Sequence, residues 1–302
     1  MSGRIRPIRG RAGRESLVMG WSIRCGSVVG FAGLAACVSI LVASCDSDGG
    51  ATKEPPAEDP PADAQADQPS EAEPAVVTAS LNRELSAVFR LIGQGRTDAA
   101  RPRLVSYLKQ HPDDGRAEFL LGLTYHREKR YALARPQFTQ AIELEPQYHP
   151  TYHFLGWCLY YLGETQAARA AFERHLTFVP TEGDSHFGVG LIDFDEDRLD
   201  DAELRFRTAI KLQADNPRRV RDVSKAHARL ADVYIRGNAL EDAKAQLQLA
   251  TDLWPEHYAA FYKLSRVLTR LGEIEAAEEA FRLYKQWQER VRPRRGVPGR
   301  AP

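Results

Sequence analysis

Small, apolar and aromatic residues recur at a fixed interval of 34 along residues 81–291. The recurring positions are held by alanines (Ala100, Ala134, Ala168 and Ala202), glycines (Gly122, Gly156 and Gly190), phenylalanines (Phe138, Phe172 and Phe206) and prolines (Pro112, Pro146 and Pro180). From Ala202 to Ala243 the interval is 41, which indicates seven extra residues between the fourth and fifth units. A fixed interval of this length is typical of a solenoid, in which each structural unit stacks on the next.

Each interval contains two stripes of core-type residues at helical spacing. Positions 4, 7, 8 and 11 of a unit share one face of a first helix, and positions 20, 24 and 27 share one face of a second. Small residues at positions 8 and 20 let the two helix axes approach closely, and proline near position 32 ends the pair. The pattern therefore predicts an all-α fold, an α-solenoid of six antiparallel helical hairpins.

The six predicted units cover 81–114, 115–148, 149–182, 183–216, 224–257 and 258–291. The seven extra residues, 217–223, place Pro217 at a helix start. They also extend the apolar stripe of the fifth unit's first helix, which runs through Val220, Val223, His227, Leu230 and Tyr234. We therefore expect two added turns on this helix.

These features resemble the tetratricopeptide-repeat (TPR) family, whose unit is a 34-residue helical hairpin. The unit 115–148 matches best, with Leu121, Gly122, Tyr125, Ala134, Phe138, Ala141 and Pro146 at the family's positions. Only Glu118 departs, since the family has an aromatic residue there. The unit 81–114 matches least, as expected for a terminal unit with one face toward water. The resemblance implies a superhelical, non-enzymatic scaffold that binds a segment of another protein in a concave groove.

In TPR proteins, positions 5, 9, 12 and 13 of the units line that groove. The resemblance thus implies a partner-binding groove lined by Phe89, Phe119, Leu123, His126, Arg127, His153, Trp157, Tyr160, Tyr161, Phe187, Phe194, Tyr262, Arg266 and Arg270. A large exposed apolar band usually marks a binding site, although single members can instead pack between neighbouring units. The Lys and Asn that grip a peptide carboxylate in one TPR subclass are replaced here by Leu85 and Phe89.

The stretch 152–163, YHFLGWCLYYLG, has no formal charge and is apolar all round. Such a segment is either buried or faces something other than water. We expect Leu155 and Leu159 to face the core and Trp157 and Tyr161 to face the partner. The same aromatic side chains support an alternative function, which is stacking on the sugar rings of a cell-wall polymer.

The N-terminus has the order of an export signal. Six arginines come first, the run from Cys25 to Ser44 is uncharged, and the string LVASC ending at Cys45 resembles the lipobox of bacterial lipoproteins. The resemblance implies that 1–45 is a signal segment and that Cys45 becomes the lipid-bearing first residue. The uncharged run is also long enough to remain as an uncleaved membrane anchor. Both alternatives place the rest of the chain outside the cytoplasm, membrane-anchored on the periplasmic side of the cell envelope.

The segments that flank the repeats have no core-forming pattern. Residues 46–80 contain nine acidic residues, six prolines and one lysine, so we expect a disordered linker. Such a linker would hold the folded part at least roughly 30 Å from its anchor. Residues 292–302 are basic, and we expect a disordered tail.

Charge excludes one class of partner. The formal net charge is zero, which gives no argument for nucleic acid. Four aspartates between Asp193 and Asp201 have the spacing of a calcium loop, but Arg198 and Leu204 occupy the places of its glycine and glutamate. A solvated turn is therefore favoured over a calcium site.

Cysteine and histidine provide no catalytic or metal constellation in the sequence. His149 and His153 are four residues apart without a third ligand at firm spacing. Cys158 lies in an apolar run without a paired base, which favours a buried thiol over a nucleophile. We therefore expect a binding protein that is not an enzyme and needs no metal or cofactor.

Overall fold

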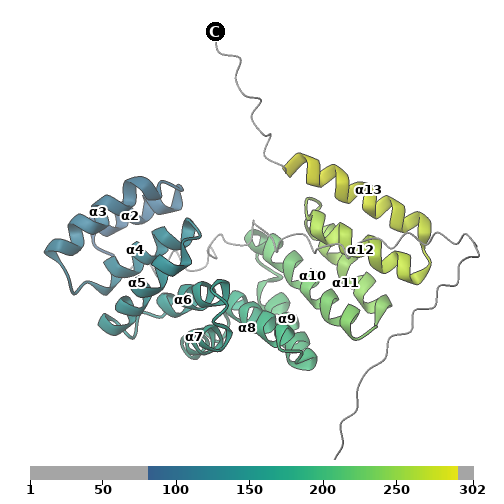
Figure 1. Ribbon diagram of the computed structural model, residues 1–302, viewed down its shortest axis with the longest axis horizontal. Helices are drawn as coiled ribbons and strands as arrows, with labels where there is room; N and C mark the ends of the chain where they lie inside the picture. The colour runs from purple at the N-terminus through teal and green to yellow at the C-terminus, as the bar shows by residue number, and fades with distance from the viewer. Residues whose placement is uncertain (1–80, 292–302) are drawn as a thin grey trace, which may run out of the picture. The chain divides into compact units, whose positions relative to one another are not determined.

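The computed structural model describes residues 81–291, and these residues form a chain of α-helices joined by short turns (Figure 1). The helices are α2 (Arg83–Gly93), α3 (Thr97–Gln110), α4 (Gly115–Arg127), α5 (Tyr131–Leu144), α6 (Pro150–Tyr161), α7 (Thr165–Phe178), α8 (Gly183–Asp195), α9 (Leu199–Gln213), the 3-10 turn η1 (Pro217–Arg219), α10 (Val220–Arg236), α11 (Leu240–Leu253), α12 (Tyr258–Leu271) and α13 (Ile274–Val291). The expected signal segment with Cys45, the linker and the tail lie outside the described residues.

Consecutive helices pack as hairpins, and each hairpin packs on the next. The pairs are α2/α3, α4/α5, α6/α7, α8/α9, α10/α11 and α12/α13. The second helix of each pair contacts the first helix of the following pair, and α4, α6, α8 and α10 also contact one another in sequence. This arrangement confirms the all-α solenoid of six hairpins that the 34-residue period predicts.

Glycine at position 8 of a unit faces the phenylalanine at position 24. A Cβ atom on Gly156 would lie 2.6 Å from the Phe172 ring, and one on Gly122 would lie 2.7 Å from the Phe138 ring. Phe172 is also covered from the other side, because a Cβ on Gly188 of the next unit would lie 2.7 Å from its ring. The recurring glycines and phenylalanines of the sequence are therefore the contact surfaces of neighbouring helices.

Every hairpin turns on one residue in the left-handed backbone region. These residues are Gly95, Lys129, Gly163, Asp197, Asn238 and Gly272, with φ between 57° and 81°. Each occupies position 15 of its unit, between the first helix and the second. Glycine adopts this conformation without steric cost, and asparagine and aspartate tolerate it better than other residues.

The seven extra residues of the fifth unit form two different turns. Pro217–Arg219 is a 3-10 turn capped by Asn216, whose side chain accepts a hydrogen bond from the Arg218 backbone amide. An α-helical turn follows from Val220, which makes α10 17 residues long. The added length places the first turn of α10 beside α8 and α9.

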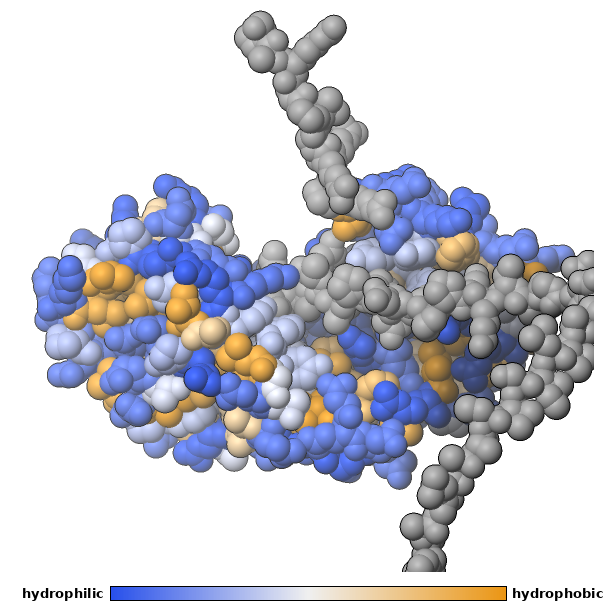
Figure 2. All heavy atoms as spheres, viewed as in Figure 1, coloured by the Kyte–Doolittle hydropathy of each residue, from blue (hydrophilic) through white to orange (hydrophobic). Residues whose placement is uncertain are grey.

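Hydrophobic residues on the surface are dispersed. On the face shown in Figure 2 they form separate patches among hydrophilic residues. Within residues 81–291, no helix combines the length and the apolar character that a membrane crossing requires.

Candidate functional site

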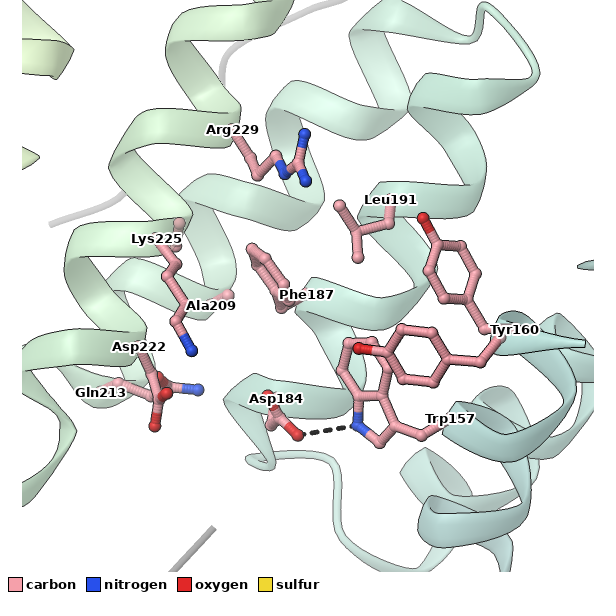
Figure 3. A pocket seen from close by; sticks show the side chains of 12 residues that line it. Trp157, Tyr160, Asp184, Phe187, Leu191, Ala209, Gln213, Asp222, Lys225 and Arg229 are labelled. Atoms are coloured by element: carbon pink, nitrogen blue, oxygen red, sulfur yellow. Dashed lines mark hydrogen bonds between the residues drawn. The ribbon is translucent and has the colours of Figure 1, made fainter. Parts of the chain in front are cut away.

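A pocket opens between α6, α8, α9 and α10, and Figure 3 shows most of its side chains. Its cavity volume is about 70 Å³, and the pocket is partly open to solvent. It is lined by Trp157, Tyr160 and Tyr161 from α6, Asp184, Phe187 and Leu191 from α8, Ala209 and Gln213 from α9, and Asp222, Lys225, Ala226 and Arg229 from α10. Three consecutive units therefore contribute their first helices to one site.

Aromatic residues of α6 and α8 form one wall of the pocket. The Trp157 ring lies 5.9 Å from Tyr161, 6.0 Å from Tyr160 and 6.3 Å from Phe187. Tyr160 and Tyr161 are half-buried, whereas Trp157 is only 7% exposed because its ring also packs edge-on against Phe172 at 5.2 Å. The wall presents large aromatic rings, which suit contact with an apolar or planar group.

Hydrogen bonds fix the orientation of these rings. Trp157 donates from Nε1 to Asp184 Oδ2 at 2.9 Å, as the dashed line in Figure 3 shows. Tyr160 donates its hydroxyl to Asp195 Oδ2 at 3.2 Å, and burial together with Asp195 raises the pKa of Tyr160 to about 12. Both rings therefore keep their polar atoms satisfied while their apolar surfaces face the pocket.

Asp184 lies at the base of the aromatic wall, where α8 begins. Burial alone would raise its pKa, but contacts with His153 and Arg219 and the hydrogen bond from Trp157 lower the pKa of Asp184 below its ordinary value. His153 Nε2 lies 3.2 Å from Asp184 Oδ2, the same oxygen that accepts the Trp157 hydrogen bond. An ionised carboxylate is thus maintained beside the Trp157 ring.

Behind Asp184, a chain of buried hydrogen bonds joins two units. His153 Nδ1 and His175 Nδ1 each lie 2.9 Å from the Ser185 hydroxyl. His153, His175 and Ser185 are at most 1% exposed. The order carboxylate, imidazole, hydroxyl resembles a catalytic triad, but a fully buried serine has no access to a substrate, so the chain fastens α8 onto α6 and α7.

Charged and polar side chains form the opposite wall. Asp222, Lys225 and Arg229 come from α10, and Gln213 comes from α9. Burial and the nearby Asp184 raise the pKa of Asp222. In Figure 3, Phe187 lies between this wall and the aromatic one. The pocket therefore combines an apolar surface with both signs of charge.

Four of the predicted groove residues, Trp157, Tyr160, Tyr161 and Phe187, line this pocket together. Four others lie in the core instead, and this corrects the expectation of an open groove along the second unit and the start of the third. They are Phe119, Leu123, His126 and His153, with exposed fractions of 0, 1, 3 and 1%. For the α4 residues the physical reason is that α6 covers α4, with Phe154 placing its ring 5.6 Å from Phe119 and from His126. His153, on α6 itself, is enclosed by His175 and Ser185.

His126 is buried among aromatic rings. Its neighbours are Tyr131 at 5.4 Å, Phe154 at 5.6 Å and Phe138 at 6.4 Å between ring centroids. Neither ring nitrogen has a hydrogen-bond partner within the described part of the chain. Burial lowers the pKa of His126 to about 3, so the ring stays neutral.

The remaining six predicted groove residues lie apart from the pocket. Phe89 is half-buried against the hydrophobic core of the first two units, and Arg127 is half-buried with a pKa lowered by burial. Phe194 lies under Arg236 at 3.8 Å, which suits a cation–π contact. In the last unit, Arg266 lies over Tyr262 at 5.9 Å, and Arg270 donates to Asn238 at 2.8 Å. Arg270 thus joins the last two units, whereas the Arg266–Tyr262 contact lies within α12.

The apolar stretch on α6 differs from the prediction in which side is buried. Trp157 at 7% and Leu159 at 6% are both buried, while Leu155 is only half-buried. Leu155 packs both against the hydrophobic core of the first two units and against that of the third and fourth units. A helix in the middle of a solenoid is contacted on several sides, so a simple division into core face and partner face does not hold here.

The metal and nucleophile candidates have other roles in the structure. Asp193 is 2% exposed and accepts hydrogen bonds from Arg169 at 2.8 Å and from Arg198 at 2.7 Å. Burial raises the pKa of Cys158 to about 12, and its thiol donates to the Tyr131 carbonyl at 3.0 Å. Within residues 81–291, no group of three or more His, Cys, Asp or Glu side chains could hold a metal ion.

Sequence reasoning missed the charged wall, and a signal for it existed. Asp184 and Lys225 both occupy position 2 of their units, on the same face as positions 5 and 9. Asp222 lies in the seven-residue extension, which brings the first turn of α10 to the pocket. Charged residues at position 2 of the units and in the extension are therefore the sequence signal for this wall.

Comparison with known proteins supports the fold. Residues 90–149 and 228–290 match the tetratricopeptide-repeat family model. The chain thus contains TPR units, and residues 81–291 form a TPR solenoid, a scaffold for protein–protein interaction that is typically non-catalytic. No curated protein matches the sequence.

Several solved structures share the fold at low sequence identity. PilW, a type IV pilus biogenesis factor, is 18% identical with a TM-score of 0.58, over 66% of this chain and 91% of that one. PilF of Pseudomonas aeruginosa is 14% identical with a TM-score of 0.57, over 72% and 98%. Cut9 in complex with Hcn1, of the APC/C, is 16% identical with a TM-score of 0.60, over 68% and 39%. At these identities the likeness extends to the fold alone.

Proposed function

We propose that this protein is a membrane-tethered scaffold that binds a segment of a partner protein in the pocket between α6, α8 and α10. The observation that carries the proposal is the convergence of three units on one hollow with an aromatic wall and a charged wall. Such a pocket can hold an apolar side chain of the segment against Trp157 and Phe187. The charged wall can meanwhile pair with the segment's backbone and polar groups.

The rigidity of the aromatic wall supports binding. Trp157 and Tyr160 are held by Asp184 and Asp195 before any ligand arrives, so little side-chain freedom is lost on binding. Aromatic residues in such positions commonly dominate interface energetics. Tyr160 is the most suitable residue for a test, because it is half-buried and its removal leaves the Phe172 contact of Trp157 intact.

The test places a photo-cross-linking amino acid at Tyr161, and the cross-linked partner peptide is mapped by mass spectrometry. We expect Tyr160→Ala to lower affinity for the mapped segment by about thirty-fold, since loss of an aromatic anchor costs about 2 kcal/mol. Tyr160→Phe keeps the ring, loses only the hydrogen bond to Asp195, and is the matched control. Thermal melting verifies that both variants fold.

A second cross-linking position controls for surface stickiness. Leu204 on α9 is 63% exposed and does not line the pocket. If the same partner peptide cross-links equally from Leu204 and Tyr161, or if Tyr160→Ala binds as tightly as the wild type, the pocket is not the binding site.

The polar wall also gives a basis for the alternative, a site for a cell-wall polymer. Gln213, Asp222 and Lys225 face the aromatic rings, and sugar sites combine ring stacking with such hydrogen-bonding groups. A soluble glycan fragment that changes the fluorescence of Trp157 and is lost with Tyr160→Ala would favour this alternative. A protein peptide mapped from Tyr161 would favour the scaffold.

The tether is the part of the proposal that rests on the sequence. The arginine-rich start, the uncharged run and the string ending at Cys45 support lipid attachment on the periplasmic side of the envelope. Fatty-acid labelling of the expressed chain that disappears with Cys45→Ser would support acylation at this residue. Labelling that persists in the variant would exclude it.

A further inference from the structure

The phenylalanine at position 24 is buried in three units and exposed in the last. Phe138, Phe172 and Phe206 are each 0% exposed, whereas Phe281 on α13 is 38% exposed. In the inner units this ring lies between its own hairpin and the first helix of the next hairpin, as Gly156 and Gly188 show on either side of Phe172. Among residues 81–291 no further hairpin follows α13, so the described part of the chain provides no such outer cover for Phe281.

The outer face of α13 is the end of the described array, beyond α12 (Figure 1). The helix has 18 residues and is therefore about 27 Å long. A stripe along this face contains Ile274, Glu278, Phe281, Lys285 and Gln288, spaced four, three, four and three residues apart. Ile274 is 54% exposed, and Glu278 and Lys285 are also exposed. We name these five residues the α13 stripe.

The two charges of the α13 stripe lie on either side of Phe281. Glu278 lies three residues before it and Lys285 lies four residues after it. Among the described residues neither takes part in an ion pair, and Lys285 Nζ lies 4.5 Å from the centre of the Phe281 ring. Reversing the helix direction therefore exchanges an acidic position for a basic one around the same aromatic centre.

We propose that the α13 stripe pairs with the α13 stripe of a second copy of this chain, in antiparallel orientation about a two-fold axis at Phe281. In that arrangement Glu278 of each copy faces Lys285 of the other, and the two Phe281 rings meet. A two-fold interface must be complementary to itself. The α13 stripe meets this condition, because its acidic and its basic residue exchange places when the helix direction is reversed. The second copy supplies the covering helix that the inner phenylalanines receive from the next unit.

Head-to-tail stacking on the opposite end of the array fits less well. The first helix, α2, has no large hydrophobic residue exposed on its surface. Its exposed residues include Arg83, Glu84 and Arg90, which offer no apolar partner for Phe281. The self-complementary charge pattern favours the α13–α13 pairing, which leaves the pocket on α6, α8 and α10 free.

The experiment is co-purification of two differently tagged copies of the full chain, extracted together in mild detergent. We expect the wild-type copies to associate. Glu278→Lys in both copies, or Lys285→Glu in both, should lower the co-purified fraction at least about ten-fold, because like charges then face each other twice. A Glu278→Lys copy mixed with a Lys285→Glu copy should associate at the wild-type level, since both facing pairs are then opposite in sign.

The matched control is Glu279→Lys, which changes the charge by the same amount one residue away and off the α13 stripe. It should leave association unchanged. The proposal is overturned if wild-type copies do not associate, if Glu279→Lys disrupts association as strongly as Glu278→Lys, or if the mixed pair fails to recover. Capture of a different protein through Phe281 while the copies remain separate would also overturn it. Association that depends on Glu278 and Lys285 and survives Tyr160→Ala separates this interface from the pocket.

Discussion

Phe172 on α7 and Phe281 on α13 are equivalent residues of two units with opposite surroundings. Phe172 is 0% exposed and is enclosed by glycines of α6 and α8, whereas Phe281 is 38% exposed and, among the described residues, no further hairpin follows its own. The amino acid and its place in the hairpin are the same. The difference shows that burial in a solenoid is completed by the neighbouring unit, so the ends of the array follow different rules from its interior.

The largest expected effect separates the two phenylalanines directly. Phe172→Ala should lower the free energy of unfolding by about 3–5 kcal/mol, because it leaves a large cavity in a closed core. Phe281→Ala should cost about 1 kcal/mol, because its ring is already partly in water. Urea unfolding at low protein concentration, where copies stay apart, measures both. Equal losses would mean that the last unit is as well packed as the interior.

A smaller effect tests the enclosure of Phe172 from the opposite direction. Gly156→Ala adds a Cβ atom that would lie 2.6 Å from the Phe172 ring, so it should cost about 1–3 kcal/mol through overpacking. Gly93→Ala is the matched control, because a Cβ there meets no atom within 4 Å. It should leave stability unchanged or raise it by about 0.4–1 kcal/mol through the lower chain entropy of alanine. The measurement is thermal melting of the two variants. If Gly156→Ala melted at the same temperature as Gly93→Ala, the close approach of α6 to Phe172 would be refuted.

The smallest effect concerns a polar group that the interior encloses without a partner. The folded-state pKa of His126 is about 3, below its ordinary 6.5. As the pH falls below about 6.5, the unfolded chain therefore binds a proton that the folded chain does not, and stability falls until about pH 3. At pH 5.5 this should amount to about 1.4 kcal/mol relative to pH 8.

His126→Leu should remove that part of the pH dependence. The measurement is urea unfolding of wild type and variant at pH 8 and pH 5.5. His111→Leu replaces an exposed histidine and serves as the control. If the wild type and the His126→Leu variant lose equal stability between the two pH values, His126 is not held neutral in the core.

The fold followed from the sequence because the period is a local property. Glycine at position 8 and phenylalanine at position 24 are visible in the sequence, and their contact is what sets two helices together. The extension before residue 224 was visible as well, since Pro217 and the stripe from Val220 predict helix. These features require no knowledge of distant contacts.

The candidate site could be predicted from the sequence only in part, because the exposure of a side chain depends on which helix covers its face. Phe119 and Trp157 occupy equivalent types of groove position, yet Phe119 is sealed by Phe154 and Trp157 borders a pocket. The charged wall arises from Asp222 on the extended α10, whose position relative to α6 is a property of the assembled units. A single-unit pattern does not contain that information.

The left-handed residue at position 15 has a consequence for how such an array can change its length during evolution. Gly163, Asp197 and Asn238 meet the same backbone requirement with three different side chains. Recombination between two units at this turn therefore joins a first helix to a second helix through a turn of the same backbone geometry. Units can be duplicated or lost as whole cassettes, and selection then acts on whichever hairpin becomes the terminus.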